Sequence, residues 1–203
     1  MMHGNKPMKR LSLYLFLILF TPQTTSQADD IRDFEIEGVS LGDSLLDYIT
    51  KQEIESKKKT DYKSKKFSRT YFSLSEFEIY DSLQVHFKTS DKKYKIYNIS
   101  GIIVFENNIE NCYKKKDEIV IELSNFFEDV IVDDDGIQNH PDDETGESKT
   151  NTVYFDFKSG AAAKVGCVKF GKSYKSKYKG ITNQLRVTIN TKEYTYWLTN
   201  EAY

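Results

Sequence analysis

The chain has 203 residues, with 29 lysines and arginines against 31 aspartates and glutamates and a formal net charge of −2. This near-neutral balance excludes the strongly basic proteins that bind nucleic acids through general charge, and no nucleic-acid partner is expected. A hydrophobic fraction of 38%, with 14% aromatic residues and three prolines, excludes a largely disordered chain and favours β-sheet.

Residues 1–28 have the three-part pattern of a secretory signal peptide. Lysine and arginine without any acid come first, an apolar run follows over residues 11–20, and Ala28 closes a segment with small residues where a signal peptidase reads. The apolar run is far shorter than the roughly 20 residues that cross a bilayer, so a membrane anchor is disfavoured. We therefore expect cleavage near Ala28, a periplasmic or secreted location, and no membrane span after cleavage.

The first half after this segment is predicted to hold a helix followed by three strands. Ser40 and Asp43 have the spacing of a capping box, and apolar residues follow at helical spacing to about residue 52. His86 falls on the polar side of its strand and is expected at the surface, and Gly101 is expected to mark a bulge. A stretch rich in aromatic residues, threonine and serine predicts a strand at 67–74, and alternating apolar and polar residues predict strands at 77–88 and 94–106.

The second half repeats this order of elements. Asn107 or Asn108 is expected to cap a helix that extends to Phe127, and the polar stretch 133–150 follows as a loop. Strands are predicted at 152–158, 161–170 and 181–190, with a tight hairpin at residues 159–160 and a final short element, helix or strand, at 194–198.

The order of elements predicts an α+β fold built from two consecutive units, each a helix plus a three-stranded antiparallel sheet. Residues 29–203 are expected to form the exported domain, with 29–106 and 107–203 as candidate sub-units. Each amphipathic helix would then cover the apolar face of its own sheet.

Cys112 and Cys167 are the two cysteines of the chain. In an exported protein such a pair predicts a disulfide, whereas in the cytosol the same pair would stay reduced. A bond between them would close a loop of about 55 residues, for which chain entropy gives about 4 kcal/mol of stabilisation.

The acidic stretch is a candidate cation or ligand loop through Asp133, Asp135, His140 and Asp142. When Gly136 is aligned with the invariant glycine of a twelve-residue calcium loop, Asp133 and Asp135 fall at the third and fifth positions. Ile131 then stands at the first position, which requires a carboxylate. A solvated acidic loop is therefore the alternative, and no metal or cofactor is predicted.

His140 lies among acids, which favours acid–base chemistry in an envelope hydrolase. The chain has no Gly-x-Ser-x-Gly motif to supply a nucleophile, and its histidines and cysteines lack zinc-site spacing. No catalytic residue is assigned on this basis.

Residues 171–180 alternate lysines with tyrosines between two glycines. Such a segment can hold a polyanion or a carbohydrate, and its candidate anion-binding residues are Lys172, Lys175, Lys177 and Lys179. The alternative is a solvated hairpin loop whose lysines protect a strand edge.

Several stretches of the chain resemble a family of uncharacterised exported proteins from marine alphaproteobacteria. They are Phe34–Tyr48, Ile96–Ile103, Asn111-Cys112, His140–Ser148, Phe157–Gly160 and Cys167. The resemblance covers most of the chain after the signal peptide and implies export and a shared fold, without implying an activity.

Residues 38–50, with a Gly-x-Ser sequence ahead of the first predicted helix, are similar to outer-membrane assembly lipoproteins and to the β-lactamase-inhibitor-like fold. Those proteins bind other proteins without catalysis, although this chain lacks their lipid-bearing cysteine. We therefore expect a non-enzymatic binding or envelope-structure module with a protein partner in the cell envelope. The alternatives are the hydrolase built on His140 and the polyanion or carbohydrate binder built on residues 171–180.

Overall fold

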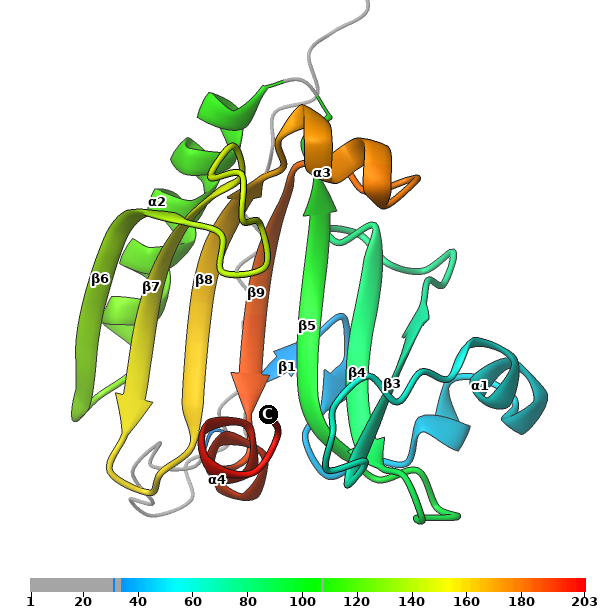
Figure 1. Cartoon of the computed structure of the whole chain (residues 1–203). Coiled ribbons are helices and arrows are strands. Elements are labelled where there is room, and N and C mark those ends of the chain that lie inside the picture. The colour runs from blue at the N-terminus through cyan, green and yellow to red at the C-terminus, as the bar shows by residue number, and fades with distance from the viewer. Residues whose placement is uncertain (1–30, 32–33, 107) are drawn as a thin grey trace, which may run out of the picture.

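A computed structural model of the chain describes residue 31 and residues 34–106 and 108–203; the predicted signal peptide, residues 1–28, lies outside them. The described chain forms a seven-stranded antiparallel sheet in the order β3-β4-β5-β9-β8-β7-β6 (Figure 1). The strands are β3 Phe67–Phe72, β4 Ser82–Lys88, β5 Ile96–Val104, β6 Val130–Asn139, β7 Lys149–Phe157, β8 Ala162–Lys169 and β9 Gln184–Asn190.

The α+β class is confirmed, but the two halves share one sheet. Strand β5 of the first half pairs with β9 of the second, from Asn98 opposite Asn190 to Val104 opposite Gln184. The prediction of two three-stranded sheets was therefore wrong, and the second half supplies four strands. The physical reason is that separate sheets would leave two more unpaired edges, and joining β5 to β9 satisfies their backbone groups.

The N-terminal segment begins with a short hairpin, β1 Glu35–Ile36 and β2 Val39–Ser40, before the turn η2 Leu45–Asp47 and the helix α1 Lys51–Lys57. The predicted capping box at Ser40 is a turn, in which the Ser40 amide donates to Asp43 Oδ2 at 2.9 Å. The capping box that opens α1 pairs Thr50 with Glu53, ten residues further on. The sequence pattern located the buried apolar residues but misplaced the start of the helix.

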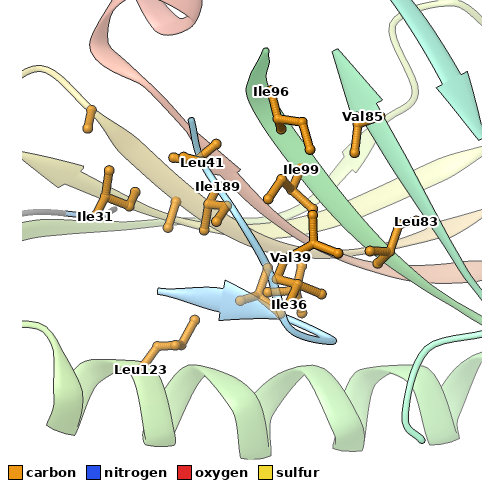
Figure 2. Packing of buried hydrophobic residues seen from close by; sticks show 14 of the residues in the cluster. Ile31, Ile36, Val39, Leu41, Leu83, Val85, Ile96, Ile99, Leu123 and Ile189 are labelled. Atoms are coloured by element: carbon orange, nitrogen blue, oxygen red, sulfur yellow. The ribbon is translucent and has the colours of Figure 1, made fainter. Parts of the chain in front are cut away.

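One face of the sheet carries the main hydrophobic core. The helix α2, Ile109–Phe126, lies behind the sheet in Figure 1, and its Leu123 packs with Ile36 and Val39 of the β1–β2 hairpin (Figure 2). A Cβ at Gly101 would lie 2.6 Å from the Tyr80 ring, so this glycine lets the Tyr80 side chain pack directly on β5. Gly101 pairs in register with Leu83 and Val187, so the expected bulge is not there; the register of β4 and β5 shifts between residues 86 and 87.

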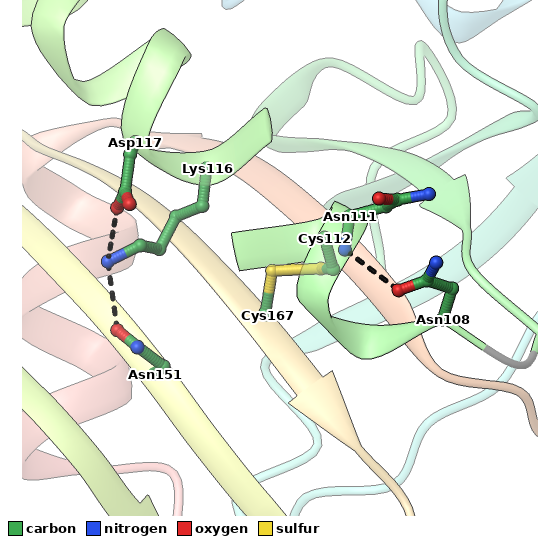
Figure 3. Close-up of a disulfide and its surroundings, with 7 residues drawn as sticks. All are labelled: Asn108, Asn111, Cys112, Lys116, Asp117, Asn151 and Cys167. Atoms are coloured by element: carbon green, nitrogen blue, oxygen red, sulfur yellow. Dashed lines mark hydrogen bonds and ion pairs between the residues drawn. A yellow bond between two sulfur atoms is a disulfide. The ribbon is translucent and has the colours of Figure 1, made fainter. Parts of the chain in front are cut away.

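A disulfide between Cys112 and Cys167 joins α2 to β8, as the sequence predicted (Figure 3). Both cysteines are buried in the main core. One turn further along α2, the buried amine of Lys116 donates to Asn151 Oδ1 at 2.9 Å and pairs with Asp117 at 3.1 Å (Figure 3). Because a helix on one face is bonded to a central part of the sheet, the bond fixes how α2 covers β8.

The helix α4, Lys192–Asn200, crosses one end of the opposite face (Figure 1). Thr191 caps it, which resolves the final predicted element as a helix. Trp197 is fully buried, packs on Phe67 and Tyr194, and donates from Nε1 to Ser64 Oγ at 2.6 Å. Among the described helices, none is both long enough and apolar enough to cross a bilayer.

Candidate functional site

The face of the sheet that carries α4 is polar at its centre. Gln84, Ser100, Thr188 and Lys164 follow one another as cross-strand partners on β4, β5, β9 and β8. The neighbouring row runs through His86, Asn98 and Asn190. Directly opposed residues of neighbouring strands point to the same side of a sheet, so these two rows form one polar surface.

A cavity of about 130 Å³ lies over these rows. Its floor is the polar surface of β4, β5, β9 and β8, and Tyr62, Tyr194 and Leu198 complete its lining. At the middle of the floor the hydroxyls of Ser100 and Thr188 share a hydrogen bond of 2.9 Å. Small side chains at the centre and long side chains around them leave room above the sheet.

His86 is the most unusual group in this cavity. It is 3% exposed, and its Nδ1 lies 2.7 Å from Asn98 Oδ1, while Asn98 Nδ2 donates to Asn190 Oδ1 at 2.5 Å. Because the Asn98 oxygen is an acceptor, the imidazole proton belongs on Nδ1, which leaves Nε2 as a buried acceptor with no partner among the described residues. The expectation of a surface histidine was wrong, because α4 and its aromatic residues cover that face.

Burial holds His86 in the neutral form. Desolvation lowers the pKa of its imidazole to about 3, the guanidinium groups of Arg69 and Arg186 add to the lowering, and the hydrogen bond to Asn98 opposes it. At neutral pH the ring is therefore an uncharged acceptor facing a site that contains fixed cations.

Lys164 and Arg186 are those cations, on the neighbouring strands β8 and β9. Within the described part of the chain, neither forms an ion pair with a carboxylate. Arg186 Nη1 donates to Gln84 Oε1 at 2.8 Å, and its Nε and Nη2 face the Gln184 amide at 3.1 and 3.2 Å. Burial lowers the pKa of the Lys164 amine, and the charge of Arg186 lowers it further.

A second cavity, of about 180 Å³, adjoins the first. Lys164, Asn190 and Leu198 line both cavities. The second adds Asp156 and Thr195, and within the described part of the chain the buried Oγ1 of Thr195 also has no hydrogen-bond partner. The lysine thus stands at the boundary between two hollows on one face of the sheet.

None of the predicted acidic residues lines either cavity, although Asp133 is the cross-strand partner of Tyr154, which lines the second one. Asp133 and Asp135 lie exposed on β6, an edge strand, and the β6–β7 register shifts between Asp134 and Ile137. Residues 130–139 are therefore a strand and not the predicted loop. Acidic residues and a bulge on an edge strand discourage pairing with other chains, which gives Asp133 and Asp135 a structural role beside the exposed Ile131 and Ile137.

His140 and Asp142 lie in the turn between β6 and β7. The His140 ring packs 5.5 Å from Phe170 and 5.3 Å from Tyr174, between ring centroids, and its Nδ1 accepts from the Asp142 amide at 3.2 Å. The neighbouring Asp143 is buried, and bonds from Ser148 and Thr145 hold its pKa well below the usual range. These contacts stabilise a turn, and no described nucleophile hydrogen-bonds to the His140 ring.

The lysine and tyrosine segment contains the helix α3, Lys172–Lys177, in place of the expected hairpin loop. Glu147 accepts from the Ser173 amide at 3.1 Å, and the Gly171 amide donates to Ser148 Oγ at 2.9 Å, so α3 is docked on the β6–β7 turn. The surface exposes Lys172 and Lys177 of α3 and Lys179 just after it. Lys175 is half-buried.

Sequence reasoning missed the residues of the cavity floor. Their only signal was alternation: every second residue is polar in β4 and β9, as are Asn98 and Ser100 of β5, which usually indicates a face in water. Here Tyr62, the α4 residues Tyr194 and Leu198, and the long side chains around the two rows bury most of the polar face, so it became a lined cavity.

Comparison of the chain with protein-family models, with curated proteins and with solved structures gives no significant match. Among the described residues, no group of three or more histidines, cysteines and acidic residues is placed to hold a metal ion.

Proposed function

We propose that the protein is an exported, non-enzymatic binding module whose binding surface is the polar face of the sheet beside α4. The observation that carries this proposal is the cavity lined by His86, Lys164 and Arg186. Among the described residues, His86 Nε2 has no hydrogen-bond partner, and no carboxylate forms an ion pair with Lys164 or Arg186. Buried polar groups in folded proteins are nearly always paired, so groups left open in a cavity favour a site that a ligand completes.

The absence of catalysis in this proposal is supported by what surrounds the candidate groups. The His140 ring packs against two aromatic rings and accepts a hydrogen bond from a backbone amide. The His86 ring is hydrogen-bonded to the side-chain amide of Asn98. Neither imidazole hydrogen-bonds to a described serine, threonine or cysteine, which a nucleophile–base pair requires.

Export is supported by the disulfide, because such a bond persists in an oxidising compartment. We expect that the full chain made in a bacterial host with its own N-terminus is cleaved after Ala28 and leaves the cytoplasm. Mass spectrometry of the periplasmic and medium fractions should find a polypeptide that begins at Asp29. A full-length chain in the cytosol whose cysteines both react with an alkylating reagent would contradict export.

The binding surface is tested by NMR with a library of small probes that includes sugars, amino acids, organic anions and cations. We expect the probes that bind to shift the backbone signals of Ser100, Thr188 and Lys164, at the centre of the polar face. Parallel assays with hydrolase substrates should show no turnover.

Two outcomes would contradict the proposed function. The first is that the bound probes gather on β6 or on α3 and leave the polar face unchanged. The second is a turnover that His140→Ala abolishes, which would instead support the envelope hydrolase.

A further inference from the structure

We infer that the cavity over Ser100 and Thr188 binds a small organic anion, a carboxylate or a phosphate, that also carries a hydroxyl group. This inference rests on the proposed function, because it names the class of ligand for the same face. It follows from three properties of the site: its fixed charge, its unpaired acceptor and its size.

The fixed charge of the cavity is positive. Lys164 and Arg186 lie on neighbouring strands two residues out of register, since Lys164 opposes Thr188 and Arg186 opposes Gly166. Two like charges at such diagonal positions repel each other, and burial increases the cost. An anion between them would remove this repulsion, whereas a neutral or cationic ligand would not.

The partners of Arg186 in the described chain are uncharged. Its guanidinium donates to the amide oxygen of Gln84 and faces the amide of Gln184. These bonds orient the group without neutralising it. A carboxylate or phosphate oxygen is the stronger acceptor for the remaining donors, because such bonds are charge-assisted.

The unpaired acceptor is Nε2 of His86, a residue that lines the cavity although this atom has almost no accessible surface in the free protein. Asn98 fixes the imidazole proton on Nδ1, and the lowered pKa keeps the ring neutral, so Nε2 has a lone pair that a donor reaches when the adjacent rings of Tyr62 and Tyr194 shift. An anion alone supplies acceptors and would leave Nε2 unpaired. A hydroxyl group on the same ligand can donate to it, and sites built in this way discriminate strongly against analogues that lack the donor.

The size of the cavity sets the size of the ligand. A dry cavity of about 150 Å³ accommodates benzene, with six carbon atoms. The first cavity has about 130 Å³ and opens beside a second of about 180 Å³ across Lys164. The ligand core therefore has roughly six non-hydrogen atoms, and a longer ligand extends past Lys164 towards Asp156.

The test is an NMR titration of the full exported chain with four probes at low salt. Lactate and glycerol 3-phosphate are the hydroxylated anions, propionate lacks the hydroxyl group, and glycerol lacks the charge. We expect lactate or glycerol 3-phosphate to bind at least about tenfold more tightly than both propionate and glycerol, which corresponds to about 1.4 kcal/mol. The tighter of the two anions identifies a carboxylate or a phosphate site, and salt should weaken its binding.

The variant Lys164→Met keeps the apolar stem of the side chain and removes the charge. It should weaken anion binding at least about tenfold and raise the midpoint of thermal unfolding without ligand, because a buried repulsion is lost. Lys169→Met is the matched control: it is an exposed lysine of the same strand, on the opposite face. It should change neither property.

Three results would overturn the inference. They are anions that bind no better than glycerol, an equal loss of binding in Lys169→Met, and a lower unfolding midpoint for unliganded Lys164→Met. If sugars or other neutral probes shift the polar face while anions do not, the ligand class is wrong and the proposed binding surface stands. If no probe of any class shifts that face, the proposed function is wrong as well.

Discussion

Lowering the pH from 7 to 3 is expected to destabilise the fold by about 4 kcal/mol through His86 alone. Burial lowers the pKa of the folded imidazole to about 3, whereas in the unfolded chain it is about 6.5. Between pH 6.5 and pH 3 the imidazole is protonated in the unfolded chain and neutral in the folded one. The free energy of unfolding therefore falls as the pH falls through this range. Above pH 6.5 both states are neutral, and the contribution of His86 is constant.

The groups around His86 explain why the folded protein does not stabilise its protonated form. Arg69 on β3 and Arg186 on β9 oppose protonation, and Asp61 and the Asn98 amide favour it more weakly than burial opposes it. The aromatic rings of Tyr62 and Tyr194 pack against the imidazole and exclude water. The site is therefore built for a neutral ring.

The measurement is denaturant unfolding at several pH values for the natural chain and for His86→Gln. Other carboxyl groups titrate in the same range, and the difference between the two proteins isolates His86. The acid-induced loss of stability should be smaller by about 4 kcal/mol in His86→Gln than in the natural chain. Equal pH dependence in the two proteins would show that the imidazole is protonated in the folded state.

Removal of the disulfide is expected to lower the free energy of unfolding by about 3–4 kcal/mol. The bond closes a loop with a sequence separation of 55 residues, so its loss restores entropy to the unfolded chain. For a domain of this size such a loss corresponds to a fall of roughly 10 °C in the unfolding midpoint. The double variant Cys112→Ala, Cys167→Ala also loses the packing of two buried sulfur atoms.

Calorimetry of the natural chain and of the double variant, each with and without a reducing agent, separates these contributions. Reduction should lower the midpoint of the natural chain towards that of the variant and leave the variant unchanged. If neither reduction nor substitution changes the unfolding midpoint, the disulfide does not restrict the unfolded chain. Its support for an oxidising, exported location is then removed.

The sequence predicted much of the fold because many of its elements have strong local patterns. Alternating residues located β4, β5, β7, β8 and β9 to within a few residues, and the amphipathic stretch after residue 107 located α2. The helix α1 was misplaced because two capping boxes compete: Ser40 and Asp43 form a turn, and Thr50 and Glu53 begin the helix. Strand β6 was missed because an edge strand in water tolerates acidic residues that resemble a loop.

The sequence could not predict the candidate site, since its residues come from four strands that are distant along the chain. Gln84 and Lys164 reach one cavity only because β5 pairs with β9, and no local pattern encodes that pairing. The residues that were conspicuous in the sequence, His140 and the lysines of 171–180, lie at surface turns and on α3.

The sequence by itself determined the α+β class, the elements with regular hydrophobic spacing and the pair of cysteines that bond, because each depends on local periodicity or on a count of two. Only the tertiary structure decided that both halves form one sheet and that α4 covers its polar face. His86 is buried beneath this cover, and among the described residues its Nε2 has no partner while Lys164 and Arg186 pair with no carboxylate. Because such groups cost free energy when they are left without partners, this face is the candidate site.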